Sequence, residues 1–390
     1  MTGRNGAASS PTLVGLVGCG NIAERYVEGM KRFPELALAG CADVDGRFAS
    51  ALSERLGIRA YPSVEELLAD PAISLIVNIT PPRAHEAVTR AALKAGKHVY
   101  VEKPITTDPE PANQLLLEAK KAGLLVGAAP DTFLGSAAQT ARKAVDDGVI
   151  GRPIAAVACI RYSRAEKWHP DPTFLFQPGG GPSLDLGPYY VTALVNLFGP
   201  VSEVSAFSSI GASHRTVTAP ERRVDSIEVT TPTHASASLR FENGTIATVI
   251  SSFDIWDTDM PFIEVFGENG TLQLGDPNEY DSPVRVRRHD DPDWSVLEPV
   301  FTPTGEPATP VQLLRGIGVA DLASALSGAD LHASGALALH VLDVITAFNR
   351  SSDRSEVVRI GSAVDRPTPS RRATAIESSP DTNRLEGITL

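Results

Sequence analysis

The chain has 390 residues, of which 42% are hydrophobic, and a formal net charge of −12. It is long enough to bury a large core and too long for one typical domain, so we expect two domains. The acidic balance argues against the concentrated basic surface that nucleic-acid binding requires. No apolar stretch is long enough to cross a bilayer, and residues 1–11 lack a signal-like apolar region, so a cytoplasmic protein with a flexible N-terminus is expected.

The cysteines and histidines give no metal or disulfide pattern. Cys19, Cys41 and Cys159 form neither an even disulfide framework nor a metal-ligand spacing, and we expect them to be small buried apolar side chains. The histidines are scattered, with no close His/Cys pair that would hold zinc. No metal is predicted.

The first predicted strand, residues 13–17, runs into a glycine turn and a helix. Gly18 permits the tight turn, Gly20 lets the backbone approach a pyrophosphate, and Ala23 keeps the helix close to the strand. The N-terminal N–H groups of that helix would face the phosphates with the positive end of its dipole. The expected cofactor contacts in this turn are Gly18, Gly20, Asn21 and Ile22.

A second strand, residues 37–42, ends at Asp43. This position is near the offset of about 20 residues expected for an acid that binds the adenosine ribose. A carboxylate there favours the 2′-hydroxyl of NAD over the 2′-phosphate of NADP, so NAD is predicted. Arg47 lies close enough to leave NADP open. A domain that binds another nucleotide, or none, is the alternative interpretation.

Strands and helices keep alternating up to residue 130, which predicts a Rossmann domain over residues 12–130 with α/β order. Ligands of such sheets lie beyond the carboxyl ends of the strands. Thr80 and Pro81 follow one strand, and Glu102 and Lys103 follow the strand at residues 98–101. His85 starts the intervening helix, where cofactor contact and surface exposure are both plausible.

Lys103 would stand beside a nicotinamide. A cis bond before Pro104 would direct its side chain toward the cleft. The alternative for Glu102 and Lys103 is a solvated charge pair at a strand end.

Beyond residue 130 the pattern changes to long alternating runs with hairpin signals at Asn243-Gly244 and at residues 267–270. We expect residues 131–362 to form an α+β domain with a large, mostly antiparallel open sheet. Its uncovered face favours a homodimer or homotetramer formed by sheet stacking, with a solvated monomer face as the alternative. Residues 363–390 are expected to be disordered.

A glycine-rich segment, residues 179–189, introduces a helix. Its glycines would let the backbone approach a ligand, while Asp185 and Tyr189 lie four positions apart across the helix start. Tyr190 is the alternative aromatic residue at this site. Further substrate-contact candidates are Asp131 after the last Rossmann strand, Arg161 and Arg164 after a later strand, and Trp168 and His169 in a Pro-rich loop.

Together these motifs resemble the glucose-fructose oxidoreductase, inositol dehydrogenase and MocA family of sugar oxidoreductases. The resemblance covers roughly residues 13–360 and includes the Gly18 turn, the Glu102-Lys103-Pro104 motif, residues 179–189 and the hairpin at 267–274. It implies that Lys103 and Asp185 act on a sugar hydroxyl at the nicotinamide.

Tyr189 stands where the family commonly has histidine. The resemblance also includes members similar to glucose-fructose oxidoreductase and dihydrodiol dehydrogenase that carry tyrosine there. A phenol ionises near pH 10 and needs a nearby cation, Lys103, or a helix N-terminus to accept a proton near neutrality. In this interpretation Tyr189 takes the proton, Lys103 binds the oxygen and Asp185 orients the sugar. His169 is the minority alternative for the base.

The expected function is hydride transfer between NAD(P) and a sugar, sugar derivative or cyclitol, as an NAD(P)-dependent dehydrogenase acting on CH–OH groups. Two other functions stay open: a redox-neutral NAD-dependent glycosidase or lyase, and a non-catalytic NAD-binding sensor. Net production of NADH separates the first function from both.

Overall fold

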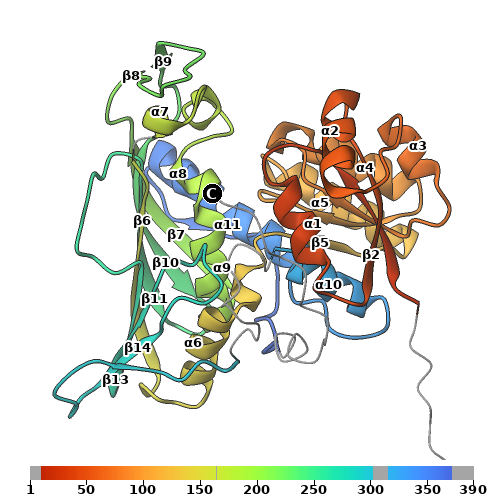
Figure 1. Ribbon diagram of the computed structural model, residues 1–390. Helices are drawn as coiled ribbons and strands as arrows, with labels where there is room; N and C mark the ends of the chain where they lie inside the picture. The colour runs from red at the N-terminus through yellow and green to blue at the C-terminus, as the bar shows by residue number, and fades with distance from the viewer. Residues whose placement is uncertain (1–9, 164, 302–314, 371–390) are drawn as a thin grey trace, which may run out of the picture.

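The computed structural model describes residues 10–163, 165–301 and 315–370 (Figure 1). Two sheets stand side by side with a layer of helices between them. The expected fold class, a Rossmann domain followed by a mostly antiparallel sheet, is confirmed. Arg164 lies outside the described residues.

The first sheet has five parallel strands in the order β2-β1-β3-β4-β5. Its central strands are apolar and buried on both faces because helices cover both sides. The strands are Thr12–Val17 (β1), Leu36–Ala42 (β2), Leu75–Asn78 (β3), His98–Val101 (β4) and Val126–Ala128 (β5). The helices are Ala23–Met30 (α1), Gly46–Leu56 (α2), Val64–Ala69 (α3), Pro82–Lys94 (α4) and Pro109–Ala122 (α5).

Side-chain caps and left-handed residues fix the ends of these helices where the sequence indicated them. The Ser63 hydroxyl accepts from the Glu66 N–H at 3.1 Å, and the Asp108 carboxylate accepts from the Glu110 N–H at 3.1 Å. Gly123 ends α5 in the left-handed conformation. The strand order changes direction between β1 and β3, which is the ligand-binding switch point of an open α/β sheet.

The second sheet has nine strands in the order β15-β14-β13-β12-β6-β11-β10-β7-β16. Its pairs are antiparallel except β6 with β11. The strands are Pro153–Arg161 (β6), Val201–Ser209 (β7), His234–Phe241 (β10), Ile246–Ser252 (β11), Ile263–Gly267 (β12), Gly270–Leu274 (β13), Arg285–Arg288 (β14), Ser295–Val296 (β15) and Val358–Arg359 (β16).

Helices cover the face of the large sheet that points toward the Rossmann domain (Figure 1). They are Ser136–Asp146 (α6), Pro182–Asp185 (α8), Gly187–Phe198 (α9) and Gly335–Arg354 (α11). On the opposite face, alternate residues of β10 are exposed, among them Ser236, Ser238 and Arg240. Phe207 of β7 lies on that face opposite Ser236 and is 76% exposed.

A smaller unit stands at one end of the large sheet and has its own hydrophobic cluster around Phe176, Val217 and Phe253. It contains Ala165–Trp168 (α7), a 3-10 turn at Thr173–Leu175 (η2), and the two-stranded sheet of His214–Thr216 (β8) and Ser226–Glu228 (β9). Two of the predicted substrate contacts, Trp168 and His169, lie in this unit.

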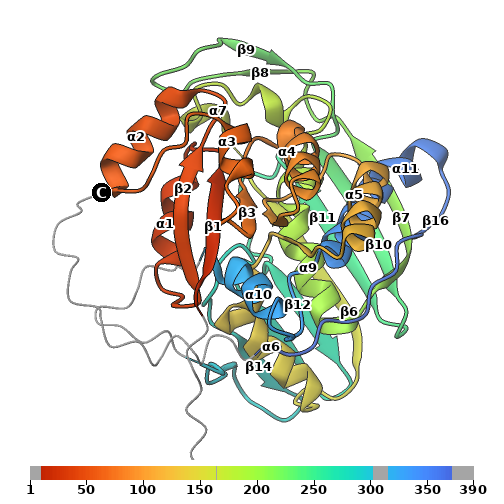
Figure 2. The ribbon, with the colours of Figure 1, turned by 90° about the vertical axis from the view of Figure 1, so that its right-hand side faces the viewer.

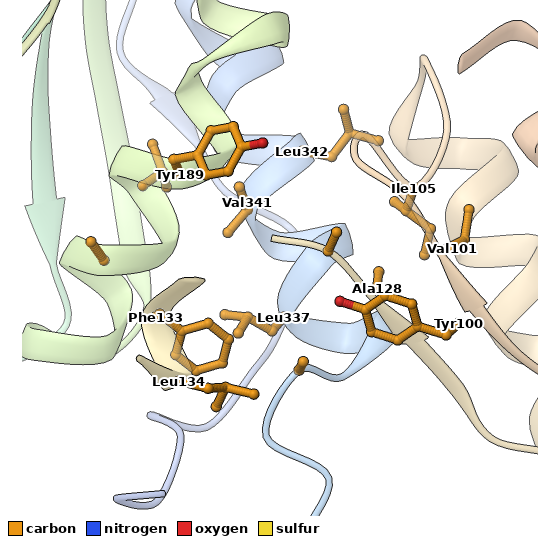
Figure 3. Packing of buried hydrophobic residues seen from close by; sticks show 14 of the residues in the cluster. Tyr100, Val101, Ile105, Ala128, Phe133, Leu134, Tyr189, Leu337, Val341 and Leu342 are labelled. Carbon is orange, nitrogen blue, oxygen red and sulfur yellow. The ribbon is translucent and has the colours of Figure 1, made fainter. Parts of the chain in front are cut away.

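The C-terminal part of the chain contacts both domains. The expected division at residue 130 assigns this part to the second domain alone. Ile317–Ala325 (α10) packs on α1, β4 and β5 of the Rossmann domain, while α11 contacts both α5 and β7 (Figure 2). The Ala128 N–H donates to the Ala333 carbonyl, so this segment also pairs with the edge strand β5. Figure 3 shows side chains of α11 between the two domains, with Leu337, Val341 and Leu342 beside Phe133, Tyr189, Tyr100 and Ile105.

The expected disordered tail does not begin at residue 363. Arg366 donates to the carbonyl of Asn196 at 3.1 Å, and the Ser370 N–H donates to the Gln139 side chain at 2.9 Å. Residues 363–370 are therefore packed on α6 and α9, and the rest of the tail lies outside the described residues.

Two further expectations concern the cysteines and the membrane. Cys19, Cys41 and Cys159 are buried free thiols. Within residues 10–163, 165–301 and 315–370, no helix has the length and apolar character needed to cross a bilayer.

Candidate functional site

The glycine turn has the geometry that a dinucleotide phosphate requires. Gly18 has φ +100°, and an added Cβ would lie 2.9 Å from the backbone of Ile79 and Thr80. An added Cβ on Gly20 would meet nothing within 4 Å, so this side of the turn is open. No side chain caps the N-terminus of α1 at Ile22; the Ala23 N–H donates to the Gly20 carbonyl at 3.0 Å, and the positive end of the helix dipole still suits an anion.

Asp43 is held at the end of β2 by two backbone donors. The Cys19 N–H donates to Oδ2 at 2.7 Å and the Asp45 N–H donates to Oδ1 at 3.0 Å. These bonds tie the carboxylate to the glycine turn and leave it capacity for further hydrogen bonds. Arg47 forms an ion pair of 2.6 Å with Asp45, which keeps the guanidinium on that neighbouring carboxylate.

The loop after β3 lies against Gly18, with Thr80 and Pro81 at the switch point of the sheet. The buried amide of Asn78 shapes it: Oδ1 accepts from the Thr80 hydroxyl at 2.7 Å, and Nδ2 donates to the His85 carbonyl at 3.1 Å. The one sign of this role in the sequence is that Asn78 is a polar residue near the end of an otherwise apolar predicted strand.

The structure places His85 away from the surface, contrary to both expectations for it. Its ring is completely buried, with Nδ1 2.6 Å from the Pro104 carbonyl and Nε2 2.7 Å from the Thr80 carbonyl. His85 thus lies between the loop after β3 and the loop after β4, and its neutral ring can donate to one of the two carbonyls. Burial lowers the pKa of His85, and the two carbonyls offset this only in part.

Lys103 reaches across the boundary between the domains. Its Nζ lies 2.8 Å from Oδ1 of Asp185 and 2.6 Å from the Asp185 carbonyl, and the Lys103-Pro104 bond is cis as expected. Burial alone would lower the pKa of Lys103, but the charges of Asp185 and Tyr189 outweigh it and raise the pKa above its ordinary value. The side chain therefore stays an ammonium at neutral pH and serves as a donor.

Asp185 and Tyr189 do not share one helix: Asp185 ends α8, and Tyr189 lies in the first turn of α9. The Lys103 Nζ is 5.5 Å from the centroid of the Tyr189 ring. Burial raises the pKa of Tyr190, and the charges that act most on it are those of Asp276 and Arg161. The structure therefore brings Tyr189, and not Tyr190, beside Lys103.

Gly180 and Gly181, just before α8, serve internal packing, whereas Gly179 has no atom nearer than 3.8 Å to an added Cβ, and its expected approach to a ligand stays a prediction. A Cβ on Gly180 would collide with the backbone of Phe174 and Leu175, and one on Gly181, at φ +89°, would lie 3.0 Å from the Pro232 carbonyl. They let η2 and the residue 231–232 turn close on α8, which fixes the position of Asp185.

Glu102 is enclosed by protein groups. Its Oε1 accepts from the Tyr26 hydroxyl at 2.9 Å and from Arg315 at 3.0 Å, and its Oε2 accepts from the Lys103 N–H at 2.7 Å. Arg315 also donates to the Tyr189 hydroxyl at 3.5 Å. The sequence motifs do not reveal Arg315, because a single arginine just before a C-terminal helix has no distinguishing pattern.

The prediction that Asp131 contacts the substrate is not supported, because its side chain is completely buried. One oxygen accepts from the Tyr280 hydroxyl at 2.6 Å, and the other accepts from the N–H groups of Gly316 and Gly318 at 3.3 and 3.0 Å. Asp131 thereby anchors the start of α10. Burial raises its pKa despite these donors.

The remaining substrate candidates, Trp168, His169 and Arg161, lie in and next to α7 and at the end of β6. Burial raises the pKa of Tyr162, which sequence reasoning did not single out; a hydrogen bond with Trp168 offsets this in part, and the charge of Asp185 adds to it. Trp168 is 58% exposed and contacts His169 edge to face. The His169 Nδ1 accepts from the Asp171 N–H at 3.1 Å, which uses that nitrogen in a loop turn.

Arg161 stacks on Phe262, with 4.0 Å from its guanidinium carbon to the ring centroid, and its Nη1 is buried without a partner among the described residues. No contact joins Arg161 to Lys103 or Asp185 in the described part of the chain. Its expected role in substrate binding therefore stays a prediction.

The residues present fit a dinucleotide. The open glycine turn and the N-terminus of α1, which has no side-chain cap, suit a pyrophosphate, and Asp43 suits ribose hydroxyls. Lys103 lies at the carboxyl edge of the sheet, where the other end of the cofactor would be. An ammonium, a carboxylate and a phenol then meet where the reactive end of the cofactor belongs.

Comparison with known proteins agrees with this assignment. Residues 12–129 match the family described as "Oxidoreductase family, NAD-binding Rossmann fold", and residues 138–273 match "GFO/IDH/MocA C-terminal domain". Among curated relatives, 1,5-anhydro-D-fructose reductase of Ensifer adhaerens is 34% identical over 36% of this chain and 43% of its own length. Myo-inositol 2-dehydrogenase of Thermotoga maritima is 26% identical over 66% of this chain and 74% of its own length.

Solved structures show the same fold over nearly the whole chain. An NAD-binding oxidoreductase from Klebsiella pneumoniae superposes with a TM-score of 0.78 at 23% identity, covering 91% of this chain and 100% of that one. Levoglucosan dehydrogenase in complex with NADH and levoglucosan superposes with a TM-score of 0.78 at 19% identity, covering 90% and 100%.

Proposed function

Because the chain belongs to the GFO/IDH/MocA oxidoreductase family, whose models match both of its domains, we propose that it transfers hydride between NAD and a hydroxyl or ketone carbon of a sugar, sugar derivative or cyclitol. The observation that carries this proposal is the contact of Lys103 with Asp185 beside Tyr189, at the carboxyl edge of the Rossmann sheet.

In the direction of oxidation, the substrate hydroxyl lies between Lys103 and Tyr189. The Lys103 ammonium donates a hydrogen bond to the substrate oxygen and stabilises the negative charge that develops on it. Tyr189, as phenolate, accepts the hydroxyl proton, and Asp185 orients both Lys103 and a neighbouring substrate hydroxyl.

NAD bound to the Rossmann domain supplies the acceptor for the hydride that leaves the carbinol carbon. The substrate loses one proton and one hydride and becomes a carbonyl compound. In reduction, the same residues act in reverse: Tyr189 returns the proton and Lys103 polarises the carbonyl.

A cyclic polyhydroxylated substrate is supported by the names of the relatives, which include an anhydrofructose reductase and an inositol dehydrogenase. The exposed ring of Trp168 suits the apolar face of a sugar, because aromatic rings stack on C–H surfaces.

The test is to titrate the protein with NADH and NADPH by nicotinamide fluorescence, and then to follow NADH absorbance with NAD and a panel of sugars and inositols. Sustained NADH formation with one polyol, lost in Lys103→Met, supports the proposal. Product formation without net NADH would point to a redox-neutral glycosidase or lyase. Tight NAD binding without turnover on a broad panel would point to a sensor.

A further inference from the structure

Arg315 is an arginine whose side chain is only 13% exposed and lies beside Tyr189 and Glu102. Burying a guanidinium is costly unless it is paired and hydrogen-bonded. Glu102 provides the pair at 3.0 Å. The second guanidinium nitrogen of Arg315, Nη2, is directed to the Tyr189 hydroxyl at 3.5 Å.

The chain places Arg315 there with a dedicated support. Arg315 directly precedes Gly316, whose N–H, together with that of Gly318, donates to the buried carboxylate of Asp131. Tyr280 donates to the other oxygen of the same carboxylate. Asp131 therefore fixes the backbone from which the Arg315 side chain extends.

The charged and titratable groups around Tyr189 come from four elements. Lys103 and Glu102 follow β4, Asp185 ends α8, Tyr280 lies between β13 and β14, and Arg315 precedes α10. Within the described residues, Arg315 alone donates to the Tyr189 oxygen. The Lys103 ammonium contacts the ring at 5.5 Å from its centroid and directs its hydrogen bonds to Asp185.

We propose that Arg315 is the positioning residue that holds the Tyr189 hydroxyl and stabilises negative charge on its oxygen. It is thus Arg315, and not Lys103, that prepares the phenol to accept a proton, which leaves Lys103 to bind the substrate oxygen. Glu102 keeps the guanidinium in place by accepting from Nη1, whereas Nη2 is the nitrogen directed to the phenol. The catalytic part of this inference rests on the proposed dehydrogenase function.

A titration without substrate tests the contact directly. The ultraviolet absorbance of phenolate is followed against pH in the wild type and in Tyr189→Phe. The difference between the two curves is the signal of Tyr189. In Arg315→Gln, this signal is expected to appear at least about one pH unit higher, the effect of removing an opposite charge within a few ångström. Arg315→Lys, which keeps a charge, is expected to lie between the two.

The matched control is Arg142→Gln. Arg142 is buried, 7% exposed at its side chain, and pairs with Asp146 on α6. The control should leave the Tyr189 signal at its wild-type position, whereas thermal melting reports any loss of folding in all the variants. Coincident titrations of wild type, Arg315→Gln and Arg315→Lys would overturn the inference.

Kinetics with an accepted polyol separate this inference from the proposed function. Arg315→Gln is expected to lower kcat at neutral pH at least about tenfold, to restore part of it as pH rises, and to leave KM nearly unchanged. A shifted titration with no polyol oxidised by the wild type would defeat the dehydrogenase proposal and leave the Arg315–Tyr189 contact standing. Polyol oxidation with an unshifted titration would defeat only the inference.

Discussion

The ammonium of Lys103 lies 2.8 Å from the carboxylate of Asp185, although 82 positions separate the two residues in the chain. One belongs to the loop after a Rossmann strand and the other to a short helix on the large sheet. The pair therefore links the two domains at the site. It remains partly accessible, with side-chain exposures of 17% and 28%, so a substrate oxygen can reach the ammonium.

Lys103→Met keeps the length of the side chain and removes its charge. We expect kcat for polyol oxidation to fall about 10²–10⁴-fold, because no donor then stabilises the developing alkoxide. NADH binding, measured by fluorescence titration, should change little. Lys143→Met, at an exposed ion pair with Asp147, is the control and should retain full activity. Unchanged turnover in Lys103→Met would remove this residue from the mechanism.

Asp43→Asn tests the preference for NAD. It keeps an acceptor oxygen and removes the charge that repels a 2′-phosphate, so the ratio of NADPH to NADH affinity should rise about tenfold or more. A double variant that also carries Asp45→Asn frees Arg47 from its 2.6 Å ion pair and should raise this ratio further. Dissociation constants for both nucleotides provide the measurement, with Asp225→Asn as an exposed control. An unaltered ratio would show that Asp43 does not select the cofactor.

The buried His85 predicts a loss of stability in acid. Its folded-state pKa is lowered by burial, so the unfolded chain takes up the proton first. The stabilisation is fully present above the unfolded pKa of about 6.5 and is lost as pH falls through the lower, folded value. His85→Gln should flatten the decline of the urea midpoint below about pH 6.5. His289→Gln, at an exposed site, should leave the slope as in the wild type.

Asp131→Ala removes the acceptor of three hydrogen bonds in a fully buried position. Leaving the Tyr280 hydroxyl and the N–H groups of Gly316 and Gly318 without a partner should lower the free energy of unfolding by at least about 2 kcal/mol. Tyr280→Phe removes one of the three and should cost less. Urea unfolding provides both values, and a stability equal to that of the wild type would contradict the structural role given to Asp131.

The open face of the large sheet is proposed to bind a second copy of the chain. Phe207, 76% exposed, and Ile246, 44% exposed, lie on this face among small polar residues. Phe207→Glu should reduce the molar mass measured by light scattering. Leu117→Glu, on α5 of the Rossmann domain, is the control and should leave the mass unchanged. A monomeric wild type would rule out the proposed interface.

The sequence alone determined the local parts of this molecule. The glycine turn, the capped helices of the first domain, Asp43 and the Asn243-Gly244 hairpin each follow from short-range rules, since a turn or a cap depends on residues only a few positions apart. The motif order also identified Lys103, Asp185 and Tyr189, which the fold brings together.

Only the tertiary structure decided what the other polar residues do. Asp131 and His85 have the composition and position of site residues, yet both are enclosed, because segments from residues 104 and 316–318 close over them. Arg315 enters the site because α10 returns to the Rossmann domain. Such roles depend on contacts between segments far apart in the chain, which no periodicity or motif spacing encodes.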